Sequence, residues 1–116
     1  MRIIGGELRG RKLYSVKGTK TRPTSDRIRE AIFNILSVRV RGAVVLDLFA
    51  GTGAFGLEAL SRGAEFAAFA DARREAMIVL QRNIQACHLE EKTWYVQWDI
   101  IKNLNCLKAF KPRRGR

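Results

Sequence analysis

Three aspartates, each in or directly after an apolar run, are the side chains of this 116-residue sequence whose type and spacing could do chemistry. Carboxylates accept hydrogen bonds from ribose hydroxyls and from an adenine amino group, and they attract cationic groups. Because open parallel sheets bind ligands at the carboxyl ends of their strands, we expect the three acids to line one edge of a sheet. The acids are Asp47 in the run 43–49, Asp71 after the run 66–70 and Asp99 after the run 93–98.

A glycine-rich segment, Gly51-x-Gly53-x-x-Gly56, follows the first of these acids. Glycines at such a turn let the backbone bend sharply and let a ligand approach closely. The spacing alone also matches a dinucleotide fingerprint, so an NAD-binding Rossmann oxidoreductase fragment is an alternative. A carboxylate at Asp47 suits a cofactor with an ammonium and a sulfonium group, such as S-adenosylmethionine, and would repel a pyrophosphate. No Lys-Ser/Thr pair follows the glycines, which disfavours a P-loop.

The three apolar runs predict strands, because continuous apolar runs are typical of parallel strands covered on both faces. The residues between the first two runs predict a helix through Arg62, with Gly63 as its cap, and residues 72–87 predict a second helix. Strand, helix, strand, helix, strand implies an α/β fold with an incomplete Rossmann-like sheet of three parallel strands and crossover helices. The inward residues of the second helix would be Ala76, Val79, Leu80, Ile84 and Cys87.

A small N-terminal β-hairpin and a helix are expected before this sheet. Short apolar stretches within residues 2–16 are separated by glycines, which is typical of small strands with tight turns, and residues 17–23 predict a loop. An i, i+3, i+4, i+7, i+8 apolar pattern predicts a helix over residues 25–38. Its core-facing residues would be Ile28, Ala31, Ile32, Ile35 and Leu36, and its solvated face would carry Arg27, Arg29, Glu30 and Asn34.

The formal net charge of +11 is concentrated in the flanks of the sequence. Residues 1–41 carry eleven Lys and Arg against three acids, residues 42–110 carry seven against eight, and residues 111–116 carry four against none. We therefore divide the chain into a basic N-terminal hairpin, loop and helix, a cofactor-binding α/β half-domain and a disordered basic tail. Clustered basic side chains favour a polyanionic partner such as RNA. Charge alone is also compatible with a solvated basic surface or with an anionic membrane surface.

The absence of membrane-spanning and signal-peptide patterns predicts a cytoplasmic protein that is not embedded in a membrane. No apolar run reaches the roughly 20 residues of a membrane-spanning helix, and the first residues lack the apolar core of a signal peptide. Cys87 and Cys106 lack the spacing of a metal site, so we expect reduced, partly buried thiols and no metal. His88 lies at a predicted helix end, where a surface position is expected rather than a catalytic one.

The segment from Val45 to Ala64, with Asp47-Leu48-Phe49-Ala50-Gly51-Thr52-Gly53 at its centre, resembles motif I of the bacterial small-subunit ribosomal RNA (guanine-N2)-methyltransferases. Residues 21–34 and 1–6 are also similar to that family, and the resemblance extends from residue 1 to about residue 108. It implies a class I S-adenosylmethionine-dependent enzyme that methylates the exocyclic N2 of a guanine in small-subunit ribosomal RNA. Residues 42–110 would then be the half-domain that binds S-adenosylmethionine.

The resemblance also implies roles for individual residues. At Asp71 the family usually has glutamate, and either carboxylate can hold a ribose diol. The cofactor would contact Asp47, Phe49, Ala50, Gly51, Thr52, Gly53, Asp71, Ala72, Asp99 and Ile100, with Arg22, Pro23 and Thr24 near its amino-acid end. Ribosomal RNA, or a small-subunit assembly intermediate, would contact Arg2, Arg9, Arg11, Lys12, Lys20 and Arg22.

One family motif is missing from the sequence. The family's fourth strand finishes in Asn/Asp-Pro-Pro-Tyr/Phe, which accepts hydrogen bonds from the target amino group and stacks on the base. Here Phe110 is followed by Lys-Pro-Arg-Arg-Gly-Arg. We therefore expect a chain truncated before its catalytic segment, with no catalytic residue and no methyl transfer activity. A non-catalytic RNA-binding module is the alternative from a different class of function.

The resemblance implies a monomer for a full-length member of the family. The first strand of this chain would lack one neighbour in the sheet, and unpaired apolar edges favour pairing with another chain. We therefore expect that this 116-residue chain can self-associate.

Overall fold

The computed structural model describes residues 1–16 and 23–110, and of residues 23–25 it describes the backbone alone. The order of elements confirms the predicted α/β fold, in which strands and helices alternate after an N-terminal segment and a helix. The elements are α1 (Pro23–Val40), β1 (Val44–Asp47), α2 (Ala54–Ser61), β2 (Phe66–Asp71), α3 (Arg74–Ala86), the 3-10 helix η1 (Glu90–Lys92), β3 (Thr93–Gln97) and the 3-10 helix η2 (Asn105–Ala109).

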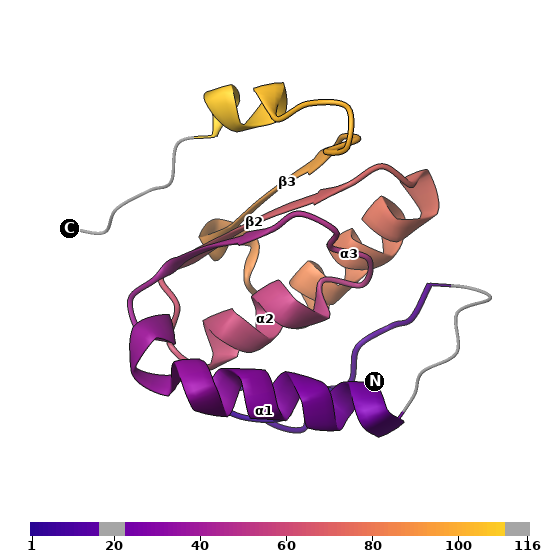
Figure 1. Ribbon diagram of the computed structural model, residues 1–116. Helices are drawn as coiled ribbons and strands as arrows, with labels where there is room; N and C mark the ends of the chain where they lie inside the picture. The colour runs from indigo at the N-terminus through magenta and orange to yellow at the C-terminus, as the bar shows by residue number, and fades with distance from the viewer. Residues whose placement is uncertain (17–22, 111–116) are drawn as a thin grey trace.

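The three strands form one parallel sheet in the order β1-β2-β3. Helices α1, α2 and α3 lie on one side of this sheet and η2 lies on the other (Figure 1). Every residue of β2 is buried, as expected for the central strand of a sheet covered on both faces. Because all strands point the same way, Asp47 at the end of β1 and Asp71 at the end of β2 lie at one edge of the sheet.

Small and aliphatic side chains on α2 and α3 pack against β2 and determine which face of each helix is buried. Leu57 of α2 and Leu80 of α3 are fully buried and pack in the same core as Phe69. Most residues predicted on the inner face of α3 are confirmed, because Ala76, Leu80, Ile84 and Cys87 are buried, whereas Val79 is half-buried. Met77 and Asn83, which the prediction omitted, are also buried.

The predicted inner face of α1 is wrong. Ile28 is 58% exposed and Ile35 is 83% exposed, while Arg29 and Phe33 are buried at 2% and 4%. Ala31 and Leu36 are also exposed, and of the predicted set Ile32 alone is half-buried. The reason is a pair of contacts that a single-helix pattern cannot reveal: Arg29 forms an ion pair with Glu58, and Phe33 packs on Phe55 and Arg62.

Glu58 of α2 joins the N-terminal segment to both α1 and α2. Its fully buried carboxylate accepts hydrogen bonds from the backbone nitrogens of Ile4 and Gly5, each at 2.9 Å. It also accepts bonds from Nε of Arg29 at 3.2 Å and from Nε of Arg62 at 2.8 Å. Four donors therefore satisfy one buried charge, which meets the condition under which such a charge is tolerated.

The predicted N-terminal hairpin is present as a single antiparallel bridge between Arg2 and Lys12. The backbone nitrogen of Ile3 donates to the carbonyl of Arg11 at 2.9 Å, and that of Leu13 donates to the carbonyl of Met1 at 2.8 Å. No longer strands form within residues 1–16 because the chain there is anchored by side chains of α2 and α3 rather than by a sheet. The predicted loop at residues 17–23 lies outside the described residues except for Pro23, which begins α1, and the predicted tail at residues 111–116 lies outside them too.

Within the described residues, β1 has a partner strand on one side only. Val44 is 39% exposed and Leu46 is 45% exposed, so the open edge of β1 carries apolar surface. An apolar groove of about 560 Å³ lies between β1 and α1, and it is lined mainly by Ile32, Leu36, Val40, Leu46, Phe49 and Phe55. Self-association through this edge stays a prediction.

The packing of α2 against β2 predicts a large effect for a small substitution at Gly56. A Cβ atom added there would lie 2.3 Å from Cε2 of Phe69, whose side chain is 1% exposed. Gly56→Ala should therefore destabilise the chain by about 1–3 kcal/mol through overpacking, although alanine is the better helix former. Urea unfolding measures the change, and Phe69→Leu in the same chain should recover part of it. A Gly56→Ala variant as stable as the parent would contradict the close packing.

Both cysteines are free and buried. Cys87 caps the end of α3 and Cys106 lies in η2. Burial raises the pKa of the Cys87 thiol, partly offset by the positive charge of Arg11. These positions agree with the prediction of buried thiols.

Candidate functional site

The glycine-rich segment forms the turn between β1 and α2. Gly51 and Gly53 have φ values of +54° and +85°, a region that L-amino acids with side chains rarely adopt. A Cβ atom on Gly53 would also lie 2.4 Å from Cδ1 of the buried Leu80. Two glycines of the motif are thus required by backbone conformation and, at Gly53, by close packing.

A cavity of about 350 Å³ opens beside this turn. It brings together five of the residues predicted to bind a cofactor: Asp47, Phe49, Ala50, Gly51 and Thr52. Sequence reasoning missed its other walls, which come from the N-terminal segment and from α1, α2 and the residue before α3. These are Met1, Val16, Ile28, Arg29, Ala54, Phe55 and Arg73.

Asp47 lies half-buried in the cavity wall at the end of β1. Its Oδ2 accepts a hydrogen bond from the backbone nitrogen of Gly56 at 3.2 Å. Burial raises the pKa of Asp47 to about 6, the Gly56 bond opposes this rise, and the charge of Asp71 adds to it. Among the described residues Asp47 forms no ion pair, so a cationic ligand group could supply a partner for its carboxylate.

Asp71 is buried at the end of β2 and is tied to the glycine turn. Its Oδ2 accepts a hydrogen bond from the backbone nitrogen of Gly51 at 2.9 Å, and its Oδ1 accepts one from the backbone nitrogen of Arg73 at 2.9 Å. Burial opposes its ionisation, but the hydrogen bonds from Arg73 and Gly51 and the charge of Arg73 outweigh burial and lower the pKa of Asp71. Asp71 is therefore ionised at neutral pH.

A buried amide holds the other side of the turn. The side-chain nitrogen of Asn83 in α3 donates to the carbonyls of Thr52 at 2.8 Å and Tyr14 at 3.0 Å. Its oxygen accepts from the backbone nitrogen of Tyr14 at 2.7 Å. The N-terminal segment and the glycine turn thus share one anchor, which explains how Met1 and Val16 come to line the cavity.

Five predicted cofactor residues do not line this cavity: Gly53, Asp71, Ala72, Asp99 and Ile100. Gly53 and Ala72 adjoin residues that do, whereas Asp99 lies two residues beyond the end of β3. The Oδ1 of Asp99 accepts a hydrogen bond from the backbone nitrogen of Ile101 at 3.0 Å, so it stabilises the turn after β3. Of the three residues predicted near the amino-acid end, Arg22 lies outside the described residues, and the side chains of Pro23 and Thr24 are not described.

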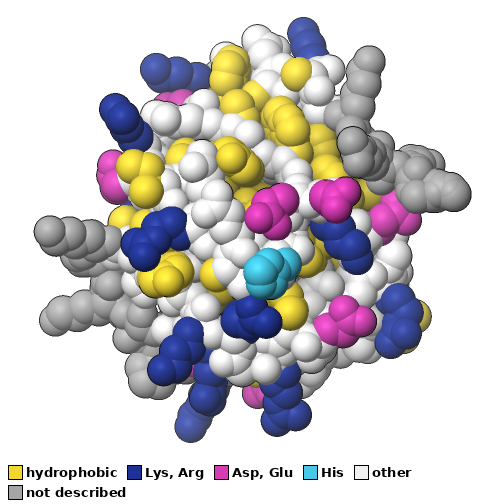
Figure 2. All heavy atoms as spheres, turned by 180° about the vertical axis from the view of Figure 1, so that it is seen from behind, with side chains coloured by type: hydrophobic (Ala, Val, Ile, Leu, Met, Phe, Trp, Pro, Cys, Tyr) yellow, Lys and Arg dark blue, Asp and Glu magenta, His cyan; other side chains and the backbone are white. Residues whose placement is uncertain are grey.

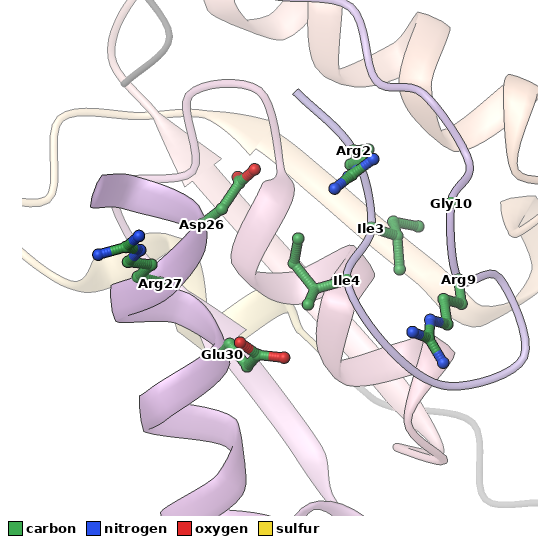
Figure 3. Close-up of a pocket in the computed structure, with 8 residues that line it drawn as sticks. All are labelled: Arg2, Ile3, Ile4, Arg9, Gly10, Asp26, Arg27 and Glu30. Carbon is green, nitrogen blue, oxygen red and sulfur yellow. The ribbon is translucent and has the colours of Figure 1, made fainter. Parts of the chain in front are cut away.

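The predicted RNA-binding side chains in the described part of the chain are exposed: Arg2, Arg9, Arg11 and Lys12. A second cavity, of about 330 Å³, lies between the N-terminal segment and α1. Figure 3 shows Arg2 and Arg9 on the segment and Asp26, Arg27 and Glu30 on the helix, where Asp26 and Glu30 extend toward the segment and Arg27 does not. The site therefore mixes both signs of charge. Lys20, like Arg22, lies outside the described residues.

His88 lies at the surface two residues beyond the end of α3, as expected for a position near a helix end. Figure 2 shows it, as the cyan side chain, on the face opposite to that of Figure 1. Its φ of 56° is left-handed, which suits a chain reversal after a helix. Among the described residues, no helix has the length and apolarity to cross a membrane, and no cluster of three or more His, Cys, Asp or Glu could hold a metal ion.

Residues 1–112 match the family model described as "Conserved hypothetical protein 95". The chain is 48% identical over 113 residues to "Ribosomal RNA small subunit methyltransferase D" of Escherichia coli K12, covering 97% of this chain and 47% of that protein. It is 45% identical over 89 residues to a Bacillus subtilis protein named as a candidate rRNA methyltransferase, YlbH, covering 77% of this chain and 48% of that protein.

Solved structures include a protein with the same arrangement of strands and helices. The candidate methyltransferase yhhF of Escherichia coli superposes with a TM-score of 0.78 at 38% sequence identity, covering 88% of this chain and 54% of that one. The chain therefore spans about half the length of the curated relatives it matches.

Proposed function

We propose that this chain, which belongs to the "Conserved hypothetical protein 95" family, forms the cofactor-binding part of a methyltransferase that acts on small-subunit ribosomal RNA. This family match and the 48% identity to the Escherichia coli protein confirm the family resemblance that was inferred from motif I. The proposed cofactor is S-adenosylmethionine, and the proposed target is the exocyclic N2 of a guanine.

The observation that carries the proposal is the pair of carboxylates beside one strained glycine turn. Asp47 lines the cavity and has no ion pair in the part of the chain that the structure describes, and Asp71 is bonded to the backbone of Gly51. Asp47 would bind the ammonium group of the cofactor, and Asp71 would accept hydrogen bonds from its ribose hydroxyls. The backbone at Gly51 and Gly53 allows the ligand to approach closely. The residues present thus fit S-adenosylmethionine.

When bound, S-adenosylmethionine supplies a methyl group on a positively charged sulfur, which is a good leaving group. The contribution of this chain is to bind and orient the cofactor, because positioning dominates such a displacement. Asp99 is proposed to accept a hydrogen bond from the adenine amino group, with Ala72 and Ile100 beside it. Arg22, Pro23 and Thr24 are proposed to lie near the amino-acid end of the cofactor.

We propose that residues 1–41 contact RNA and that residues 42–110 bind the cofactor. The exposed basic side chains of Arg2, Arg9, Arg11 and Lys12 support this division, because such side chains neutralise phosphates. Lys20 and Arg22 belong to the same proposed RNA-binding set. A salt-dependent affinity for small-subunit ribosomal RNA, lowered by charge-removing substitutions at Arg9 and Arg11, would support this role.

The isolated 116-residue chain is proposed to bind cofactor without transferring a methyl group, since its sequence lacks the Asn/Asp-Pro-Pro-Tyr/Phe tetrapeptide. Calorimetric titration with S-adenosylhomocysteine and with NAD tests the cofactor. Binding of the first and not of the second supports the proposal, and the reverse favours an oxidoreductase. Binding of RNA that survives Asp47→Ala and Asp71→Ala, with no cofactor binding, would favour a non-catalytic RNA-binding module.

Transfer of a labelled methyl group to unmodified small-subunit ribosomal RNA tests the activity. The isolated chain should give no transfer above background, and full-length Escherichia coli relative serves as the positive control. Labelled RNA formed by the 116-residue chain alone would contradict the proposed lack of activity.

A further inference from the structure

Arg73 lies two residues after the end of β2. Its side chain forms an ion pair with the carboxylate of Asp71. Its Nε donates to Oδ1 at 3.2 Å and its Nη2 donates to Oδ2 at 3.4 Å. The side chain also lines the cavity beside the glycine turn, where Nη2 would lie 3.6 Å from a Cβ atom on Gly51. The guanidinium therefore occupies part of the space next to the acid.

The hydrogen-bonding capacity of Asp71 is filled by four donors. Two are backbone nitrogens, of Gly51 and Arg73, at 2.9 Å each, and two are guanidinium nitrogens at longer distances. An ionised carboxylate has about four lone-pair positions. A ribose diol brings two further donors, so it can bind Asp71 only where the two longer contacts are released.

The guanidinium is weakly held. The side chain of Arg73 is 51% exposed, and ion pairs at such positions contribute little to stability because water and salt screen them. Arg73 also stands at the N-terminus of α3, where the helix dipole disfavours a cation. The charge of Glu75, two residues further on, attracts the guanidinium as well, which offers it an alternative position.

We propose that the Arg73 guanidinium competes with the ribose hydroxyls of the cofactor for the Asp71 carboxylate, so that the cofactor binds by displacing it. This inference rests on the proposed function and adds a residue that sets cofactor affinity. The two backbone donors, Gly51 and Arg73, hold the carboxylate beside the glycine turn throughout. Arg73 thus acts as a positioning and affinity-determining residue rather than as a catalytic one.

The test is calorimetric titration of S-adenosylhomocysteine into the 116-residue chain and its Arg73→Ala and Arg74→Ala variants. Arg73→Ala should bind about two- to fivefold more tightly than the parent, which is the range expected for release of an exposed ion pair. Arg74→Ala removes the same charge one residue further along, at an exposed position that is not among the hydrogen-bond and ion-pair partners of Asp71, and it should leave the affinity unchanged.

Two further measurements identify the diol and the charge as the cause. The gain in Arg73→Ala should shrink at high salt, since salt already weakens the ion pair in the parent. With adenosine and 2′,3′-dideoxyadenosine as probes, the gain should appear for adenosine and be absent for the analogue without the diol.

Weaker binding by Arg73→Ala would overturn the inference, because it would show that Arg73 holds the cofactor. Binding equal to that of the parent would also overturn it. A parent and two variants that all fail to bind S-adenosylhomocysteine would instead overturn the proposed cofactor, and the inference with it. The two failures are thus distinguishable.

Discussion

Glu58→Gln should destabilise this chain by about 3–5 kcal/mol, because it breaks a buried ion pair and leaves the charge of Arg29 without its main partner. The glutamine amide would also place donor hydrogens where Gly5 and Arg62, or Ile4 and Arg29, already donate. The residual pairing of Arg29 with Asp26, at 3.1 Å, limits the loss. Urea unfolding followed by circular dichroism measures the change.

Glu65→Gln is the matched control for this substitution. Glu65 is exposed and lies directly before β2, so its neutralisation should change stability by no more than about 0.5 kcal/mol. A double-mutant cycle with Arg29→Met tests the mechanism, since removing both partners should cost less than the sum of the single changes. A Glu58→Gln variant as stable as the Glu65→Gln control would refute the buried-pair argument.

Asp47→Asn should change stability and cofactor binding in opposite directions. The raised pKa, from 3.8 to about 6, means that the folded chain holds this proton to higher pH than the unfolded chain does. Ionisation of Asp47 therefore costs stability as pH rises through this window, and the full cost is present above pH 6. Asparagine removes that cost and can still accept the bond from Gly56, so the variant should be more stable at pH 7 by about 1–3 kcal/mol.

The same substitution should weaken binding of S-adenosylhomocysteine at pH 7.5 by about tenfold to a hundredfold. The reason is the lost charge-assisted contact with the ammonium group of the ligand. In the parent chain, affinity should also fall as pH drops below about 6, where Asp47 becomes protonated, and the variant should lack this dependence. Calorimetry from pH 5.5 to pH 8 measures both effects, with Glu65→Gln as the control. Unchanged affinity in Asp47→Asn would exclude Asp47 from the binding site.

Local patterns were sufficient to predict the alternation of strands and helices. Apolar runs such as 66–70 mark a covered parallel strand wherever they occur, and the glycines after β1 mark a tight turn. The position of Asp47 relative to Gly51 predicted part of the cavity wall, because both depend on one short connection. These features arise within about twenty residues of sequence.

Features that depend on distant residues were not predictable. The face that α1 turns inward is decided by Glu58, 29 residues beyond Arg29, and no periodicity within α1 reveals that partner. The pairing of Arg73 with Asp71 could have been found from their two-residue spacing, since each is charged and the turn between them is short. Asp99 was predicted directly after a strand but lies two residues beyond the end of β3, and the turn there uses its carboxylate.

The two buried cysteines supply chemical reporters of motion in two separate segments, the end of α3 and η2. A thiol reagent reaches Cys87 only when the end of α3 opens, and it reaches Cys106 only when η2 detaches from the sheet. The two modification rates therefore report the free energies with which these segments open in the native chain. Because η2 packs on the sheet through Phe110 near Phe66 and Trp94, whereas α3 shares the central core, we expect Cys106 to react first.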